Sequence, residues 1–136
     1  MSIKEKVENY KKTLDLFPND QEKYQYLIEQ AKESNEFPEE LRQDSFKVTG
    51  CQSQVWLVPE EKDDKLHFLS DSDALISKGL VTLIASIYSN ESAKDIATCE
   101  IDLMEEFDLG VILSPARRNG AYSMLKTIKE YAKKLS

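Results

Sequence analysis

The feature that most restricts the fold of this chain is an almost continuously apolar stretch between residues 74 and 88. A helix over this stretch is apolar nearly all round, so it is expected to be the central helix of the core. Ser70, followed three residues later by Asp73, resembles a capping box that opens this helix. The apolar positions are Leu75, Ile76, Leu80, Val81, Leu83, Ile84, Ile87 and Tyr88.

Helical periodicity also appears on both sides of this stretch. It predicts one helix over residues 3–14 and a second helix with Asp20 as its N-cap. A short helix over 92–98 and a turn over 102–107 follow the central helix. Ser114-Pro115 predicts the start of a final helix, because serine is a preferred N-cap and proline fits the first helical position. That helix is expected to bury Ala121, Leu125, Ile128, Ala132 and Leu135.

Two segments before the central helix have the composition of β-strands. Residues 54–60 and 65–69 flank the polar connection 61–64, which predicts a β-hairpin. Pro59 indicates an edge position or a bulge in the first strand. Residues 46–48 are expected to add a third, short strand.

Length and composition restrict the class of protein. A chain of 136 residues can bury a core without disulfides. The pattern predicts the α+β class, with a single domain over residues 1–136 and a small antiparallel β-sheet packed against helices. A net charge of −7 disfavours nucleic acid as a partner. No stretch of 18 apolar residues or secretory signal is visible, so we expect a cytoplasmic protein that does not enter a membrane.

Two cysteines without CxxC spacing are expected to be free thiols in a reducing cytosol. Cys51 follows Gly50 and precedes a polar run that leads into the first strand. A turn before a strand is accessible to partners, which favours a reactive thiol. A free cysteine is also a common small buried hydrophobe, so its context leaves both interpretations open. Cys99 ends a short predicted helix and is expected only to pack.

Several kinds of chemistry at Cys51 are disfavoured. A hydrolytic nucleophile needs a base, and the only histidine, His67, is expected to be half-exposed in the middle of a strand. A phosphatase loop needs glycines and an arginine after the cysteine, and residues 52–57 contain neither. Two cysteines and one histidine are too few for a metal or iron–sulfur site. A thiol that accepts a group and passes it on remains, and this chemistry needs no cofactor.

Three blocks of the sequence resemble the SufE family of sulfur acceptor proteins, which includes the CsdE branch. Residues 50–57 read GCQSQVWL and resemble the family's cysteine signature. Residues 70–80 and 113–120 match two further blocks in the family's order and spacing, and the resemblance extends from about residue 20 to the end. Ser70 and Arg118-Asn119 differ from the residues that the family commonly has at these positions. These differences concern the contacts with partner proteins more than the chemistry at Cys51.

The resemblance implies a function. A protein of this family receives persulfide sulfur from a pyridoxal-phosphate cysteine desulfurase, here on Cys51, and delivers it to an iron–sulfur scaffold complex. By removing sulfur it stimulates the desulfurase, so it is a transfer partner and not itself an enzyme. The family fold resembles that of the scaffold IscU, but this chain lacks the extra cysteine ligands of a scaffold. We therefore expect transfer rather than cluster assembly.

The resemblance also indicates supporting residues. Arg117 matches the arginine of the family's Ser/Thr-Pro-x-Arg pattern and is expected to stabilise a thiolate or persulfide, or to contact the desulfurase. A helix N-terminus disfavours cations, so Arg117 needs a reason of this kind. Asp71 and Asp73 precede the central helix, and at least one is expected to cap it. Either aspartate near Cys51 would oppose ionisation of the thiol. Trp56 is a candidate to cover the sulfur.

Some alternatives remain open at this level. The chain fits a CsdE-like carrier that serves a different desulfurase and acceptor. It also fits a binding module with a structural Cys51, or a cysteine hydrolase that uses His67. The sequence leaves open a monomer or a homodimer, and whether the thiol of Cys51 faces inward at rest.

Overall fold

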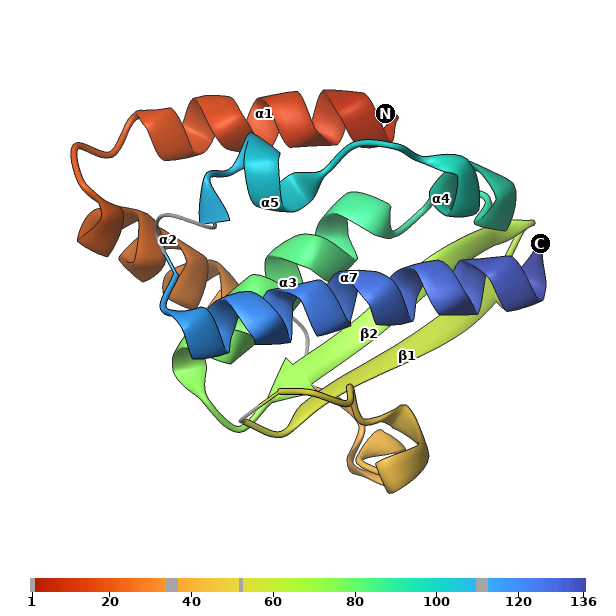
Figure 1. The fold of residues 1–136 in the computed structure, drawn as a ribbon. Coiled ribbons are helices and arrows are strands. Elements are labelled where there is room, and N and C mark those ends of the chain that lie inside the picture. Colours follow the sequence, from red (N-terminus) through yellow and green to blue (C-terminus); the bar gives the residue numbers. More distant parts are fainter. Residues whose placement is uncertain (1, 34–36, 52, 110–112) are drawn as a thin grey trace.

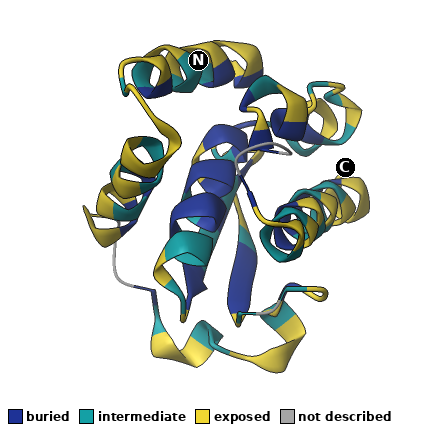
Figure 2. Cartoon of the chain, turned by 60° about the vertical axis from the view of Figure 1, so that its left-hand side comes forward, coloured by how far each residue is buried: buried dark blue, intermediate teal, exposed yellow. Residues whose placement is uncertain are grey.

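The fold is described here from a computed structural model, which describes residues 2–33, 37–51, 53–109 and 113–136. Its centre is the helix α3, Leu75–Tyr88, as the apolar stretch predicts. Figure 2 shows this helix at the centre of the molecule, mostly buried, between the other helices and the strands. The predicted core positions from Leu80 to Tyr88 are buried, whereas Leu75 at the start of the helix is 56% exposed.

The predicted capping box before α3 is wrong. The N-cap of α3 is Ala74, whose own side chain makes no capping hydrogen bond, and its backbone N–H donates to Ser72 Oγ at 3.3 Å. Ser70 belongs to the preceding strand, and the carboxylate of Asp73 accepts a hydrogen bond from the backbone of Gln54 at 3.0 Å. A capping pattern depends on where the helix begins, and here β2 continues almost to its first turn.

Two helices at the start of the chain pack on α3. Helix α1, Ile3–Asp15, has a capping box formed by Ser2 and Glu5, and α2 covers Asp20–Glu33. The predicted N-cap of α2 is off by one residue. The side chain of Asn19 accepts a hydrogen bond from the backbone of Glu22 at 2.9 Å, so Asn19 performs this role and Asp20 lies in the first turn.

The sheet is a two-stranded antiparallel hairpin. Strands β1, Val55–Lys62, and β2, Lys65–Ser72, pair over their whole lengths (Figure 1). Both extend beyond their predicted ends, because Asp63 and Asp64 have φ angles of 54° and 62° and close a two-residue turn. Glu61 and Lys62, directly before the turn, pair with β2. Their charged side chains are compatible with a strand because this end of the hairpin is exposed to solvent.

The predicted third strand over residues 46–48 does not form. The short helices η1, Glu39–Leu41, and η2, Asp44–Phe46, occupy this region, and only an isolated bridge pairs Lys47 with Trp56. After Val48 the chain turns away at a glycine, so pairing ends there. This segment covers the outer face of the hairpin through a small cluster of Phe37, Trp56 and Val58 with Leu41, Phe46 and Leu69.

Further helices follow α3 along the chain. Helix α4 covers Ala93–Thr98, α5 covers Leu103–Glu106, and α7 covers Pro115–Leu135 with Ser114 as its N-cap, as predicted. In Figure 1, α7 lies in front of α3 and the hairpin. No helix in the described ranges has both the length and the apolar character that a membrane crossing requires.

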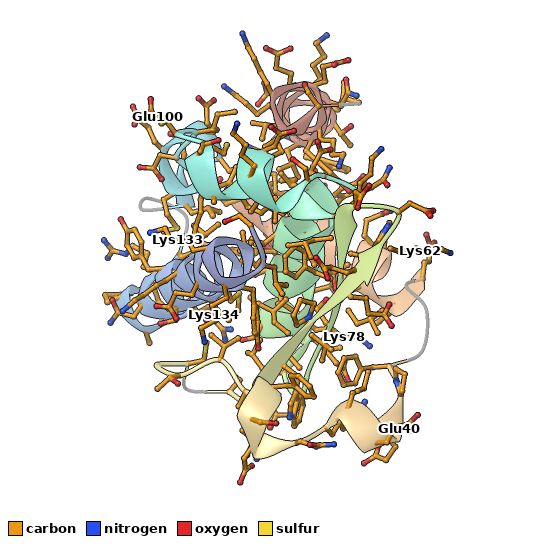
Figure 3. All side chains as sticks on the ribbon, turned by 90° about the vertical axis from the view of Figure 1, so that its right-hand side faces the viewer. Glu40, Lys62, Lys78, Glu100, Lys133 and Lys134 are labelled. Carbon is orange, nitrogen blue, oxygen red and sulfur yellow. The ribbon has the colours of Figure 1, made fainter. Side chains whose placement is uncertain are left out.

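The buried face of α7 differs in part from its prediction. Ala121, Ile128 and Ala132 are buried as expected, but Leu125 is only partly buried and Leu135 is 40% exposed. Leu135 lies in the final turn, next to the exposed Lys133 and Lys134 that Figure 3 labels at this end of the helix. Gly120 and Met124 complete the buried face instead. The fold is α+β, with a small antiparallel sheet packed against helices.

Candidate functional site

Cys51 lies on the short loop between Val48 and the start of β1 at Val55. The backbone N–H of Val48 donates to the carbonyl of Val55 at 2.8 Å, so the loop closes immediately before β1. Gly50 has a φ of +94°, and a Cβ atom there would come within 2.6 Å of Ser123 Oγ on α7. Glycine is required by both the backbone angle and the space. This turn directs Cys51 towards α7. Gln52, in the predicted signature, lies outside the described residues.

The thiol of Cys51 is half-buried against α7. Its Sγ donates a hydrogen bond to the carbonyl of Gly120 at 3.6 Å, and a Cβ atom at Gly120 would lie 3.5 Å from the sulfur. Burial raises the pKa of Cys51 above its ordinary value. At neutral pH the resting side chain is therefore a neutral thiol.

A cavity of about 140 Å³ adjoins this sulfur. Arg117 lines the cavity, so the structure brings this predicted site residue together with Cys51. Hydroxyl groups also line it, and the apolar side is formed by α3 and α7. The lining residues are Cys51, Ser53, Ser77, Leu80, Ser114, Ala116, Arg117, Gly120 and Met124.

Asp71 has a different environment from the one predicted. It is 5% exposed, forms a short ion pair with Arg42, and lies 3.6 Å from the ammonium group of Lys78. The guanidinium of Arg42 also lies over the rings of Phe37 and Trp56, at 5.5 and 5.7 Å. In Figure 3, Lys78 lies beside the two strands, on the side where Glu40 marks the η1 segment. Asp71 thus anchors this segment to the hairpin.

Asp73 ties the end of the Cys51 loop to the start of α3. Its carboxylate accepts from the backbone of Gln54 at 3.0 Å, and its own N–H donates to the Gln54 carbonyl at 3.2 Å. Neither Asp71 nor Asp73 lines the cavity or caps α3. The pKa of Cys51 is raised by burial, and neither Asp71 nor Asp73 contributes to that shift.

Trp56 does not cover the sulfur. Successive residues of a strand point to opposite faces, so Val55 and Leu57 join the main core while Trp56 joins the cluster on the outer face of the hairpin. Cys51 packs against the main core. The prediction chose the wrong face, and the backbone of Gly120 covers the thiol instead.

His67 and Cys99 both lie away from this cavity. His67 pairs with Glu60, five residues further along β1 than Val55, which is about 17 Å along the strand. It therefore cannot act as a base for Cys51 in this structure. Cys99 is the C-cap of α4, and its carbonyl accepts a hydrogen bond from Lys129 at 2.5 Å.

The sequence does not predict a place in this cavity for Gly120 or for the side chains of Ser53, Ser77 and Ser114, although it does predict Ser114 as the N-cap of α7. The sequence could have indicated a close contact at Gly120, because a glycine inside a helix is unfavourable and usually has a packing reason. That reason is the approach of Cys51 Sγ. The serines carried no such signal, since they come from a loop, from α3 and from the N-cap of α7.

The raised pKa of Cys51 predicts a pH dependence. Alkylation by iodoacetamide follows the thiolate fraction, so its midpoint in the folded protein should lie above that of the urea-unfolded chain, which is about 8.5 for cysteine. Because the folded pKa is raised, the related stability is present below the unfolded pKa and is lost as pH rises towards the folded pKa. Site-resolved mass spectrometry of the Cys51 peptide measures the rate. A folded midpoint below the unfolded one would contradict the sheltered thiol.

Known proteins resemble the chain along most of its length. A family model described as "SufE: Fe-S metabolism associated domain" matches residues 8–132. An uncharacterized SufE-like protein of Rhizobium etli is 42% identical over 120 residues, covering 83% of this chain and 80% of that protein. The protein named "Cysteine desulfuration protein SufE" of Wigglesworthia glossinidia brevipalpis is 33% identical over 127 residues, covering 92% and 88% of the two chains.

A solved structure supports the fold independently. The solution structure of a hypothetical protein from Thermus thermophilus superposes with a TM-score of 0.77 at 17% identity, covering 96% of this chain and 95% of that one. At this identity the likeness concerns the fold alone. The family model and the two curated relatives, together with a cysteine held at the predicted turn, show that this chain belongs to the SufE family.

Proposed function

We propose that this protein carries sulfane sulfur on Cys51, from a cysteine desulfurase to an iron–sulfur scaffold complex. The family is associated with Fe–S metabolism, and one relative is named a cysteine desulfuration protein. The observation that carries the proposal is the position of Cys51 Sγ at a cavity that also contains Arg117. The desulfurase cleaves the carbon–sulfur bond, and this protein takes the product away.

The transfer step is a thiol–persulfide exchange. The thiolate of Cys51 attacks the outer sulfur of the persulfide on the desulfurase. A new S–S bond forms at Cys51, the S–S bond on the desulfurase breaks, and the desulfurase cysteine leaves as a thiolate. The number of thiolates and persulfides is conserved, so the step needs no external oxidant or reductant. Removal of the persulfide frees the desulfurase for its next turnover.

The resting site suits a stored persulfide. The cavity of about 140 Å³ has room for one additional sulfur atom beside Cys51 Sγ. Arg117 supplies a positive charge for an anionic sulfur, and the surrounding serine hydroxyls supply donors. The half-buried position limits the access of water and free thiols. Storage in this position keeps the sulfur from being lost between donor and acceptor.

The same shelter means that Cys51 must move to react. In the resting position its thiol is neutral and faces the carbonyl of Gly120. Attack on a second protein requires a thiolate that reaches the surface. The contacts between Asp73 and Gln54 hold the end of the loop, so a docking desulfurase has to displace Cys51 relative to α7 while this anchor remains. This arrangement restricts transfer to the docked complex.

Persulfide mapping tests the proposal directly. The protein is incubated with a cysteine desulfurase, pyridoxal phosphate and cysteine, and its peptides are analysed without reductant. The expected product carries one additional sulfur on the Cys51 peptide, in the wild type and equally in the matched control Cys99→Ser. Additional sulfur found on Cys99 only, or on neither cysteine, would show that Cys51 is not the carrier.

A further inference from the structure

The chain before the Cys51 loop lies on the outer face of the hairpin. This covering segment, residues 37–47, contains the short helices η1 and η2, which lie below the strands in Figure 1, apart from the long helices. The backbone N–H groups of residues 41–43, 46 and 47 donate to carbonyls of the same segment. Its attachment to the hairpin therefore depends largely on side chains, together with the bridge between Lys47 and Trp56.

Arg42 makes a charged contact between the covering segment and the hairpin. Its guanidinium forms an ion pair with Asp71 of β2, whose side chain is only 7% exposed. The same guanidinium lies over the rings of Phe37 and Trp56. The second carboxylate oxygen of Asp71 lies 3.6 Å from the ammonium group of Lys78 on α3. A buried carboxylate without such partners is costly, so Asp71 fixes the position of Arg42.

The loop that carries Cys51 is held differently at its two ends. At its C-terminal end, the carboxylate and the backbone N–H of Asp73 both bond to the backbone of Gln54, at 3.0 and 3.2 Å. At its N-terminal end, the backbone N–H of Val48 donates to the carbonyl of Val55 at 2.8 Å. The residues directly before Val48 belong to the covering segment, so the contacts that hold this segment on the hairpin also support the N-terminal end of the loop.

The ion pair between Arg42 and Asp71 lies close to that end. Asp71 is the partner of Trp56 in the strand register, and Trp56 forms the bridge to Lys47, directly before the loop. Arg42 thus reaches the hairpin at the strand position beside which the loop begins. Asp71 does not line the Cys51 cavity and does not shift the pKa of the thiol. The pair therefore acts on Cys51 through the backbone and not through its charge.

We propose that Arg42 is a positioning residue for Cys51. Its ion pair with Asp71 holds the covering segment, and with it the N-terminal end of the loop, so that the thiol stays against the carbonyl of Gly120. When this pair separates, Cys51 moves away from α7 while Asp73 still holds the other end of the loop. The consequence for sulfur transfer, that a docking desulfurase has to displace this segment, rests on the proposed function, whereas the sheltering of the thiol does not.

A double variant tests the role of the pair. Arg42→Met combined with Asp71→Asn removes the ion pair without leaving a buried charge, and Met keeps an unbranched side chain beside the aromatic rings. The full-length protein is treated with iodoacetamide, and the Cys51 and Cys99 peptides are followed in the same sample by mass spectrometry. Cys51 should react about tenfold faster than in the wild type, the size of a charge-assisted contact, while the rate at Cys99 stays unchanged.

The pH dependence of this reaction identifies the cause. Arg117, which lines the Cys51 cavity, is the same in the wild type and the double variant. Because burial raises the pKa of Cys51, a thiol that leaves its sheltered position should react with a lower midpoint, closer to that of the urea-unfolded chain. A loss of stability that left the thiol in place would not lower this midpoint.

Two comparison variants complete the test. Arg42→Lys keeps a charge opposite Asp71, so its Cys51 rate should lie nearer to that of the wild type than to that of the double variant. Lys11→Met combined with Glu106→Gln removes the ion pair between α1 and α5 in the same manner, and it should leave the Cys51 rate unchanged.

Two results would overturn the proposal. One is an unchanged rate or an unchanged midpoint at Cys51 when Arg42 and Asp71 are both replaced. The other is a Cys51 rate that rises only together with that of Cys99, because the pair would then support the whole fold and not the position of the thiol. No desulfurase takes part in this assay, so its result is independent of the persulfide mapping.

Discussion

Under the proposed function, replacement of Cys51 by serine is expected to abolish any acceleration of a cysteine desulfurase by this protein. Serine keeps the size of the side chain and can donate to the Gly120 carbonyl, but it cannot form a persulfide. Because the side chain is only half-buried, stability should change by about 1 kcal/mol or less. Desulfurase turnover with and without the variant, measured as alanine release in the presence of reductant, gives the result. The rate should fall to that of the desulfurase alone.

Cys99→Ser is the matched control for this measurement. It makes the same chemical change at the other thiol, which lies at the end of α4 and outside the Cys51 cavity. This variant should accelerate the desulfurase as the wild type does. Full acceleration by Cys51→Ser would mean that the protein acts through binding alone, and that Cys51 has a structural role.

A large loss of stability is expected for Lys6→Ala. The ammonium group of Lys6 lies 2.7 Å from the carboxylate of Glu91, with side chains that are 15% and 10% exposed. It also donates to the carbonyls of Ile87 and Ser89 at the end of α3, at 3.3 and 2.5 Å. Its removal leaves a buried carboxylate and helix-end carbonyls without this donor, at a cost of about 3–5 kcal/mol in the free energy of unfolding. Urea denaturation followed by tryptophan fluorescence measures this loss.

Two further variants determine the cause of the loss. Lys11→Ala breaks the ion pair between Lys11 of α1 and Glu106 of α5, whose side chains are 43% and 40% exposed, so it should cost about 1 kcal/mol or less. Lys6→Met combined with Glu91→Leu removes both buried charges, so it should recover the part of the loss in Lys6→Ala that comes from the unpaired Glu91 carboxylate. If Lys6→Ala were no more destabilising than Lys11→Ala, the buried pair would not anchor α1 to the core.

Elements defined by local signals were predicted well. The central helix followed from its apolar run, and the start of α7 followed from Ser114-Pro115. The end of the hairpin was missed because Glu61 and Lys62 have the composition of a loop, although a solvent-exposed ladder accepts charged side chains. The prediction of a capping box at Ser70 and Asp73 was wrong because the same residues are also compatible with the end of a strand. Local pattern is ambiguous where two elements meet.

The surroundings of the candidate site depended on contacts between distant parts of the chain. Arg42 binds Asp71 across 29 positions, and Cys51 meets Gly120 across 69. Neither pairing has a local signature, so Asp71 was assigned to capping or to tuning of the thiol. The side of the hairpin that Trp56 faces also depends on the strand register and on which layer covers each face.

The sequence by itself determined the thiol, the glycine turn that presents it, the core helix and the family, because each is encoded in a short run of neighbouring residues. Only the tertiary structure decided that Cys51 is sheltered by the backbone of α7, shares its cavity with Arg117, and has its pKa raised by burial and not by an aspartate. Burial and proximity are set by the packing of α3, α7 and the hairpin against one another. That packing joins residues far apart in the chain, which periodicity and spacing do not record.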